Sequence, residues 1–232
     1  MTEPAETAIE YLHVGPYAYE PYKSGRKFYE VRPDGALGRL PFEIIDKVAF
    51  NFSKLGPHPD GKGFPDYEGV PILRFNPKRK RISDLNKNGS VWVVSDRARR
   101  LFERVDPAAF EFRPTEAMKA GKPREGDPYW LCAPIRVLDA IDENRSEIWI
   151  GRLGDHYTYS SLHLTQMKVD IVGNAHAFSP TCQVSTNVFD DVMVDEISQI
   201  GLAGFIYLDF PSVERANRQR AVHSLRPLSP WN

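Results

Sequence analysis

The chain has little cysteine, little net charge and no long hydrophobic run. Its 232 residues include two cysteines, Cys132 and Cys182, and carry a formal net charge of −1. The first residues have neither the basic nor the apolar region of a signal peptide, so we expect free thiols and a cytoplasmic protein. No apolar run approaches the roughly 20 residues that span a bilayer. The balanced charge argues against bulk attraction to nucleic acid or to a membrane surface.

The motifs of several enzyme classes are also missing. The sequence has no G-x-S-x-G, no G-x-G-x-x-G, no phosphate-loop lysine motif and no HExxH. His156 and His163 lack the i, i+4 spacing of metal-binding helices, and Cys132 lies in an apolar run where burial makes a thiol inert. We therefore expect no catalytic residue, no metal and no cofactor. The alternative is a small hydrolase or modifying enzyme with a His/Ser site built from His156, His163 and Ser160.

The segment Val91–Phe112 predicts a strand, a capped helix and a second strand. Ser95 stands at the N-cap position and Asp96 at the positive end of the helix dipole. The dipeptide Asp106-Pro107 ends the helix, because a residue that precedes proline is disfavoured in the α region. The spacing i, i+3, i+4, i+7 predicts one buried helical face, formed by Ala98, Leu101, Phe102 and Val105.

The rest of the chain predicts many strands and few helices, which favours an α+β fold with a mixed, mainly antiparallel sheet and a few packed helices. A second helix is expected at 189–200, with Gly201 after its end and a buried stripe at Phe189, Val192, Met193, Ile197 and Ile200. The Gly- and Pro-rich segment 114–128 is expected as an exposed excursion, and Pro134 should need a sheet edge or a bulge. Strands are expected at 27–32, 44–52 (with a helical start as the alternative), 71–75, 91–94, 110–112, 129–139, 148–150, 160–164, 168–172 and 204–210.

An ordered set of motifs extends beyond this segment. The order "VSDRAR…F…VDP…FEF…YWL…LDAID…VF…GL.GF" runs over about residues 90–210. It resembles a family of bacterial immunity-protein-like domains that was first catalogued as a domain of unknown function and later assigned to polymorphic toxin systems. The resemblance implies a protein that binds and neutralises a cognate toxin encoded nearby, and it supplies no catalytic residues. We expect one α+β domain over 1–232, with an N-terminal part at 1–85, an immunity-like core at 86–210 and a tail at 211–232.

A basic segment provides the candidate binding residues. Residues 74–104 contain ten Lys and Arg against three Asp and Glu, a local charge of +7. Such a segment is a solvated helix face, a protein-binding surface where charge steers association and arginine anchors contacts, or a nucleic-acid site. The overall charge disfavours the third interpretation. The candidate partner-binding set is Arg97, Arg100 and Arg104, with a rim formed by Lys78, Arg79, Lys80 and Arg81.

A third class of function also remains open. A phage-derived accessory protein or a self-associating structural protein would show the same lack of catalytic motifs. We expect a cognate protein toxin as the partner, and neither nucleic acid nor membrane. The sequence leaves the oligomeric state open.

Overall fold

The computed structural model describes residues 10–14, 25–34, 42–45, 63–64, 69–78, 82–88, 91–153, 156–163, 165–181 and 186–210, with only the backbone at 10–14, 88, 149–153, 156–163 and 210. This part of the chain is rich in strands and holds three helices, α1 (Asp96–Val105), α2 (Val169–Val172) and α3 (Asp191–Gln199). The strands are β1 (Glu10–Val14), β2 (Phe28–Pro33), β3 (Phe42–Ile44), β4 (Ile72–Phe75), β5 (Leu85–Asn88), β6 (Val91–Ser95), β7 (Phe110–Pro114), β8 (Glu116–Lys119), β9 (Lys122–Pro123), β10 (Tyr129–Pro134), β11 (Val137–Leu138), β12 (Glu147–Leu153), β13 (His156–His163), β14 (Ala177–Pro180), β15 (Asn187–Asp190) and β16 (Phe205–Phe210).

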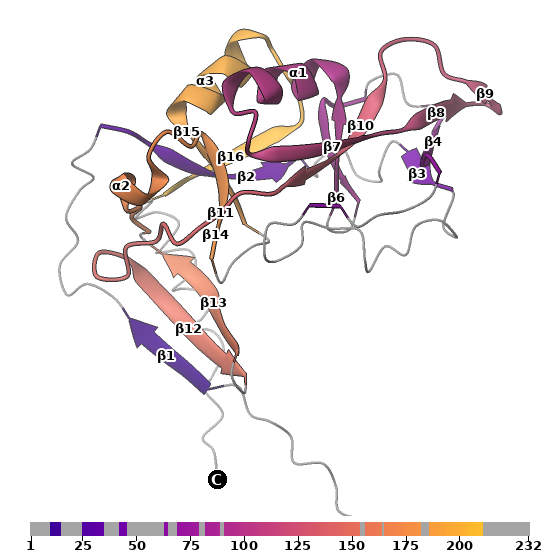
Figure 1. The fold of residues 1–232 in the computed structure, drawn as a ribbon. Coiled ribbons are helices and arrows are strands. Elements are labelled where there is room, and N and C mark those ends of the chain that lie inside the picture. The colour runs from indigo at the N-terminus through magenta and orange to yellow at the C-terminus, as the bar shows by residue number, and fades with distance from the viewer. Residues whose placement is uncertain are drawn as a thin grey trace, which may run out of the picture.

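A four-stranded sheet with the order β5-β6-β10-β7 lies in the middle of the described structure (Figure 1). Strand β6 is buried along its whole length. Trp92 and Val94 belong to the hydrophobic cluster on one face of the sheet, and Val91 and Val93 to the cluster on the other. A strand covered on both faces needs apolar side chains at successive positions, which explains the uninterrupted Val-Trp-Val-Val run.

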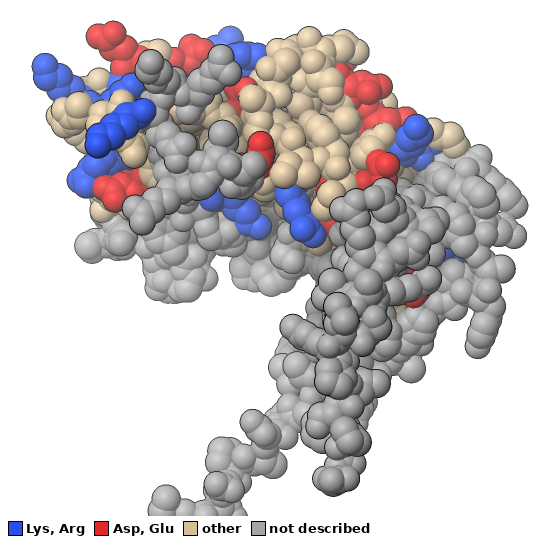
Figure 2. All heavy atoms as spheres, turned by 180° about the vertical axis from the view of Figure 1, so that it is seen from behind, with Lys and Arg blue, Asp and Glu red and all other residues tan. Residues whose placement is uncertain are grey.

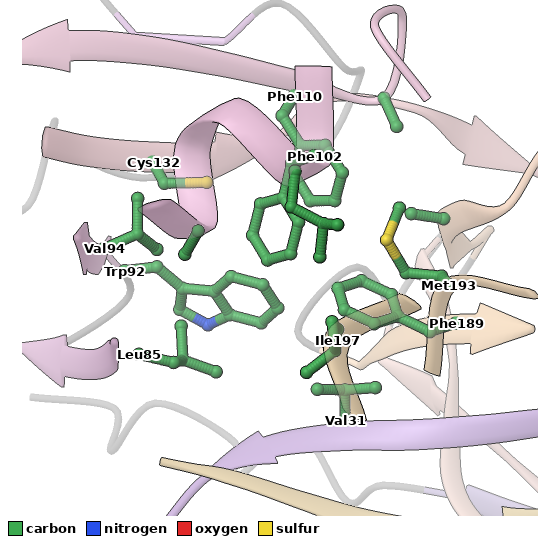
Figure 3. Packing of buried hydrophobic residues seen from close by; sticks show 14 residues of the cluster. Val31, Leu85, Trp92, Val94, Phe102, Phe110, Cys132, Phe189, Met193 and Ile197 are labelled. Atoms are coloured by element: carbon green, nitrogen blue, oxygen red, sulfur yellow. The ribbon is translucent and has the colours of Figure 1, made fainter. Parts of the chain in front are cut away.

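The larger cluster lies between this central sheet, α1, α3 and a five-stranded sheet with the order β11-β14-β15-β2-β16. Phenylalanine rings dominate it (Figure 3). Phe102 of α1 stacks on Phe110 with ring centroids 4.6 Å apart. Phe189 of β15 meets both rings edge-on, at 5.7 and 6.0 Å. These edge-to-face and stacked contacts join α1 to the second sheet, and each contributes about 0.5–1.5 kcal/mol beyond area burial.

Two further clusters cover the outer faces of these two sheets. Leu73 and Phe75 of β4 pack with Val91 and Val93 on the face of the central sheet opposite α1. Phe28 of β2 packs with residues of α2, β12 and β14 on the outer face of the five-stranded sheet. The three-stranded sheet β1-β12-β13 lies on the far side of α2 from α1 and α3 (Figure 1). No helix in the described ranges is both long enough and apolar enough to cross a membrane.

Several sequence predictions are confirmed. Helix α1 spans Asp96–Val105 as expected, and the Ser95 hydroxyl accepts a hydrogen bond from the Ala98 N–H at 3.2 Å. Gly201 has a φ of +66° after the end of α3. The Leu202 N–H donates to the Ile197 carbonyl and the Gly201 N–H to the Ser198 carbonyl, both at 3.1 Å, which are the two bonds of a Schellman cap. The strands expected at 71–75, 91–94, 110–112 and 204–210 are present within a few residues of those bounds.

The expected start of the second helix was wrong. Phe189 lies in β15, and α3 begins at Asp191 because the Asp190 carboxylate caps the helix through the Met193 N–H. Met193 and Ile197 are buried as predicted, but Val192 is 46% exposed and Ile200 39% exposed. The helix was predicted to begin too early because Phe189, a buried strand residue, fits the helical spacing by chance.

One other prediction was wrong. Residues 169–172 form helix α2 where a strand was expected, with the Gly173 N–H bonded to the Val169 carbonyl at 2.9 Å. Most residues of the excursion at 114–128 are exposed, as expected, and it contains the paired strands β8 and β9. The strand expected at 44–52 stays a prediction over most of its length, because β3 ends at Ile44 and residues 46–52 lie outside the described residues. Pro134 is the last residue of the inner strand β10, beyond the four residues that pair with β6, so it interrupts no ladder bond to that neighbour.

Candidate partner-binding surface

Arg97, Arg100 and Arg104 lie on one flank of α1, because they are spaced three and four residues apart on a helix. Two of them reach the neighbouring helix α3. The Arg97 Nη2 donates to the Ile200 carbonyl at 2.8 Å, at the negative end of α3. The Arg104 Nη2 donates to Glu196 Oε2 at 2.7 Å. This flank of α1 therefore holds α3 in place as well as presenting positive charge.

Arg100 differs from the other two because its ion pair stays within its own helix. Its Nη2 lies 2.7 Å from Asp96 Oδ2, one turn earlier, and its side chain is 74% exposed. The Arg104 side chain is also largely exposed, at 61%. Exposed ion pairs contribute only about 0–1 kcal/mol, so an incoming carboxylate can replace the internal partner at little cost. Arg97, Arg100 and Arg104, here called the arginine stripe, are therefore accessible in part but already paired within the protein.

Asp96 organises the first turn of α1. Its Oδ1 accepts hydrogen bonds from Trp130 Nε1 at 3.0 Å and from Arg99 Nε at 3.1 Å. The Arg99 guanidinium also lies over the Trp130 ring, 4.5 Å from its centroid. Burial by itself would raise the pKa of Asp96, but the hydrogen bonds and positive charges of Arg99, Trp130 and Arg100 outweigh it and lower that pKa. The carboxylate is therefore ionised at neutral pH and fixes both arginines.

A second polar cluster joins the start of α3 to β14 and the segment before β2. Asp190 is fully buried, and its Oδ2 accepts hydrogen bonds from Arg26 Nε at 3.0 Å and Nη2 at 2.8 Å. The same oxygen lies 2.8 Å from His176 Nδ1. A buried carboxylate is costly to desolvate, and these partners offset that cost.

Asp106, at the end of α1, extends this cluster. Its Oδ2 accepts hydrogen bonds from the His176 N–H at 2.7 Å and the Ala177 N–H at 3.1 Å, and it pairs with Arg136. His176 thus contacts Asp106 through its backbone and Asp190 through its ring. The cluster ties the C-terminus of α1 and the N-terminus of α3 to one strand, which fixes the relative position of the two helices. Sequence reasoning missed it, because Arg26 and Asp190 are 164 residues apart and no local signal links them.

The one described residue of the predicted rim, Lys78, lies in a different layer from the arginines of α1. Lys78 is exposed and follows β4, which packs on the face of the central sheet opposite α1. Lys78 is therefore not continuous with the arginine stripe across one face. Arg79, Lys80 and Arg81 lie outside the described residues. The described residues of the set proposed from sequence thus lie in two layers, and the role of the set in binding stays a prediction.

Of the residues considered for catalysis, the structure gives the backbone of the two histidines and the side chain of Cys132. His156 and His163 are at opposite ends of β13, opposite Leu153 and Glu147, and their side chains lie outside the description. At about 3.3 Å per residue, their backbones are roughly 23 Å apart. Cys132 is a free, buried thiol as expected, and burial raises its pKa well above the usual value. Cys182 is not among the described residues, which hold no cluster of three or more His, Cys, Asp or Glu suited to a metal.

The chain was compared with known protein families and with curated proteins. A search of curated proteins finds no match to this chain. The model of the immunity protein family Imm11 matches residues 28–212. This range extends from the start of β2 to just beyond β16. It takes in α1, α3 and four residues of the buried polar cluster, Asp106, Arg136, His176 and Asp190, while Arg26 lies just before it. The chain belongs to the Imm11 immunity protein family.

Proposed function

We propose that this protein is an immunity protein that binds and neutralises one cognate bacterial toxin by stoichiometric contact, in the cytoplasm of the cell that makes both. The toxin is expected to be encoded near it. The observation that carries the proposal is the family match over residues 28–212. Inhibition of this kind needs binding alone, and a standard interface buries about 800 Å² on each partner.

The face formed by α1 and α3 offers the chemistry of such an interface. It presents the guanidinium of Arg100, the exposed part of Arg104 and two exposed apolar side chains, Val192 of α3 and Ile200 just after its end. Arginine is enriched among residues that dominate binding energy, and apolar contacts exclude water around them. The polar cluster of Asp106 and Asp190 keeps the two helices in one arrangement, so little ordering is needed on binding.

The test is co-expression with the toxin encoded by the adjacent gene, followed by titration of the purified proteins. We expect growth to be restored on co-expression, a complex of fixed stoichiometry by light scattering, and toxin activity that falls linearly to zero at that ratio. Loss of activity at far below one equivalent would instead indicate enzymatic inactivation of the toxin. Unprotected cells together with no complex would overturn the proposal.

A further inference from the structure

Strands β8 and β9 form a short hairpin that projects from the edge of the molecule (Figure 1). Its two turn residues, Ala120 and Gly121, have φ angles of +52° and +77°. Positive φ at both central residues is the geometry of a type I′ turn, which fixes a two-residue hairpin loop tightly. Residues 119–123 are all exposed. The tip is therefore a defined shape rather than a loose loop.

The base of this hairpin is anchored on the protein core. The Arg124 N–H donates to the Ala117 carbonyl at 2.7 Å. The Arg124 guanidinium lies over the rings of Phe75 and Tyr129, 5.4 and 5.3 Å from their centroids. Strand β8 also pairs in parallel with β4, whose Leu73 and Phe75 are buried. A partner that contacts the tip therefore meets a preorganised element, which lowers the entropy lost on binding.

The tip carries concentrated positive charge. Residues 118–123 include two lysines and no acidic residue, and Lys119 lies directly opposite Lys122 in the strand register. Like charges in opposite positions destabilise a hairpin, so the folded state by itself does not favour this pair. Lys78 follows β4, whose Phe75 is opposite Lys119, so it lies at the same end of the sheet. Figure 2 shows several Lys and Arg side chains at this end of the molecule, with Asp and Glu side chains among them.

These lysines differ from the α1 arginines in having no internal anion. Within the described ranges, Lys78, Lys119 and Lys122 make no ion pair, whereas Arg97 and Arg104 are bonded to α3 and Arg100 to Asp96. An unpaired cation gives up only water when it meets a carboxylate. The hairpin tip is therefore a region where positive charge is available to a partner without breaking an ion pair of the described residues.

We propose that the β8–β9 tip is a docking element for an acidic surface of the cognate toxin, with Lys119 and Lys122 meeting its Asp and Glu carboxylates and Lys78 at the margin. This inference rests on the proposed function and names the chemistry of the partner surface. Exposed, unpaired charges of this kind act on the association rate, because they steer the two proteins together before short-range contacts form.

The test measures association of the full-length protein with the purified toxin domain encoded by the adjacent gene. The tip variant is K119E/K122E, and the matched control is K27E/K87E. The control reverses two exposed lysines away from the hairpin, one just before β2 and one in β5, and changes the net charge equally. Thermal melts first establish that both variants fold. At about 50 mM salt we expect the association rate to fall about 10-fold or more for the tip variant only, and the difference to shrink at about 500 mM.

The failures of the two proposals are distinguishable. Protection and complex formation by the wild type, with equal association rates for the two variants, would overturn the docking element and leave the proposed function intact. No protection by the wild type would overturn both. Binding of a 20-nucleotide single-stranded DNA probe that the tip variant loses, with unchanged toxin association, would identify a nucleic-acid site and also overturn the inference.

Discussion

Arg26 and Asp190 form an ion pair in which two guanidinium nitrogens donate to one buried carboxylate oxygen, at 3.0 and 2.8 Å. The other oxygen of Asp190 accepts the Met193 N–H at 3.0 Å and so caps α3. One carboxylate therefore starts a helix and binds a residue from the opposite end of the chain. The position of α3 on the protein depends on this contact.

The first prediction concerns Asp190→Asn. The amide keeps the side-chain volume but removes the charge, so Arg26 and His176 lose their anionic partner in a buried site. We expect the free energy of unfolding to fall by about 3–5 kcal/mol, the usual cost of breaking a buried pair. Urea denaturation measures this. Asp191→Asn, one residue later and partly exposed, is the control and should change stability by less than about 0.5 kcal/mol. Equal losses of unfolding free energy for the two variants would contradict the structural role given to the Asp190 carboxylate.

Two glycines with positive φ provide a second prediction. Gly204 has a φ of +97°, and a Cβ there would lie 2.6 Å from both the Leu85 carbonyl oxygen and the Ser83 Cβ. Gly201 has a φ of +66° with no atom within 4 Å of such a Cβ. Gly201→Ala should therefore lower the free energy of unfolding only by the backbone strain, about 1–2 kcal/mol. Gly204→Ala should lower it by about 2 kcal/mol more, because of the close contacts. Thermal and urea unfolding would measure both, and similar costs would show that the contact with β5 gives way easily.

The third prediction is a loss of stability at high pH through Tyr129. Burial raises the pKa of Tyr129 to about 12 in the folded state. An unfolded tyrosine titrates near about 10, so the folded state binds the proton more tightly. The stability that this proton binding contributes is fully present below about pH 10 and is lost as the pH rises to about 12. The loss is no more than about 1.4 kcal/mol per pH unit.

Tyr129→Phe removes this ionisation and keeps the ring. We expect the decline in unfolding free energy above about pH 10 to be shallower in the variant than in the wild type. Denaturant unfolding at several pH values provides the measurement. Parallel curves for the two proteins would mean that Tyr129 is not the group responsible.

The fourth prediction separates binding from structure on α1. Arg100→Glu leaves the contacts of Arg97 and Arg104 with α3 intact, so the protein should fold and bind the toxin about 10-fold more weakly if this face is in the interface. Lys87→Glu is the control. Calorimetry on folded variants measures the affinity. If a folded triple variant with Arg97, Arg100 and Arg104 all reversed bound as well as the wild type, α1 would be excluded from the interface.

The sequence predictions were accurate where the signal lay within one short segment, and they were wrong where it depended on distant residues. Helix α1 was predicted to the residue because its cap, its apolar spacing and its terminating Asp106-Pro107 lie within one short segment. The start of α3 was missed because Asp190 acts as the cap only once β15 has brought the chain there. Residues 169–172 were misread because four residues are too few to show a periodicity, and the turn is set by its packing under Phe28 and Phe178.

The sequence by itself determined the family, the predominance of strands, the arginine stripe on α1 and the inert, buried state of Cys132. These follow from neighbouring residues and from ordered motifs, which fix propensity, periodicity and capping. Only the tertiary structure decided which charges are internally paired and which are free. Arg26 meets Asp190 and Arg104 meets Glu196 across 164 and 92 residues of chain, whereas Lys119 and Lys122 project on a tight turn with no such partner in the described structure. Ion pairing depends on distances of a few ångströms, and those distances are set by the packing of sheets and helices rather than by position along the chain.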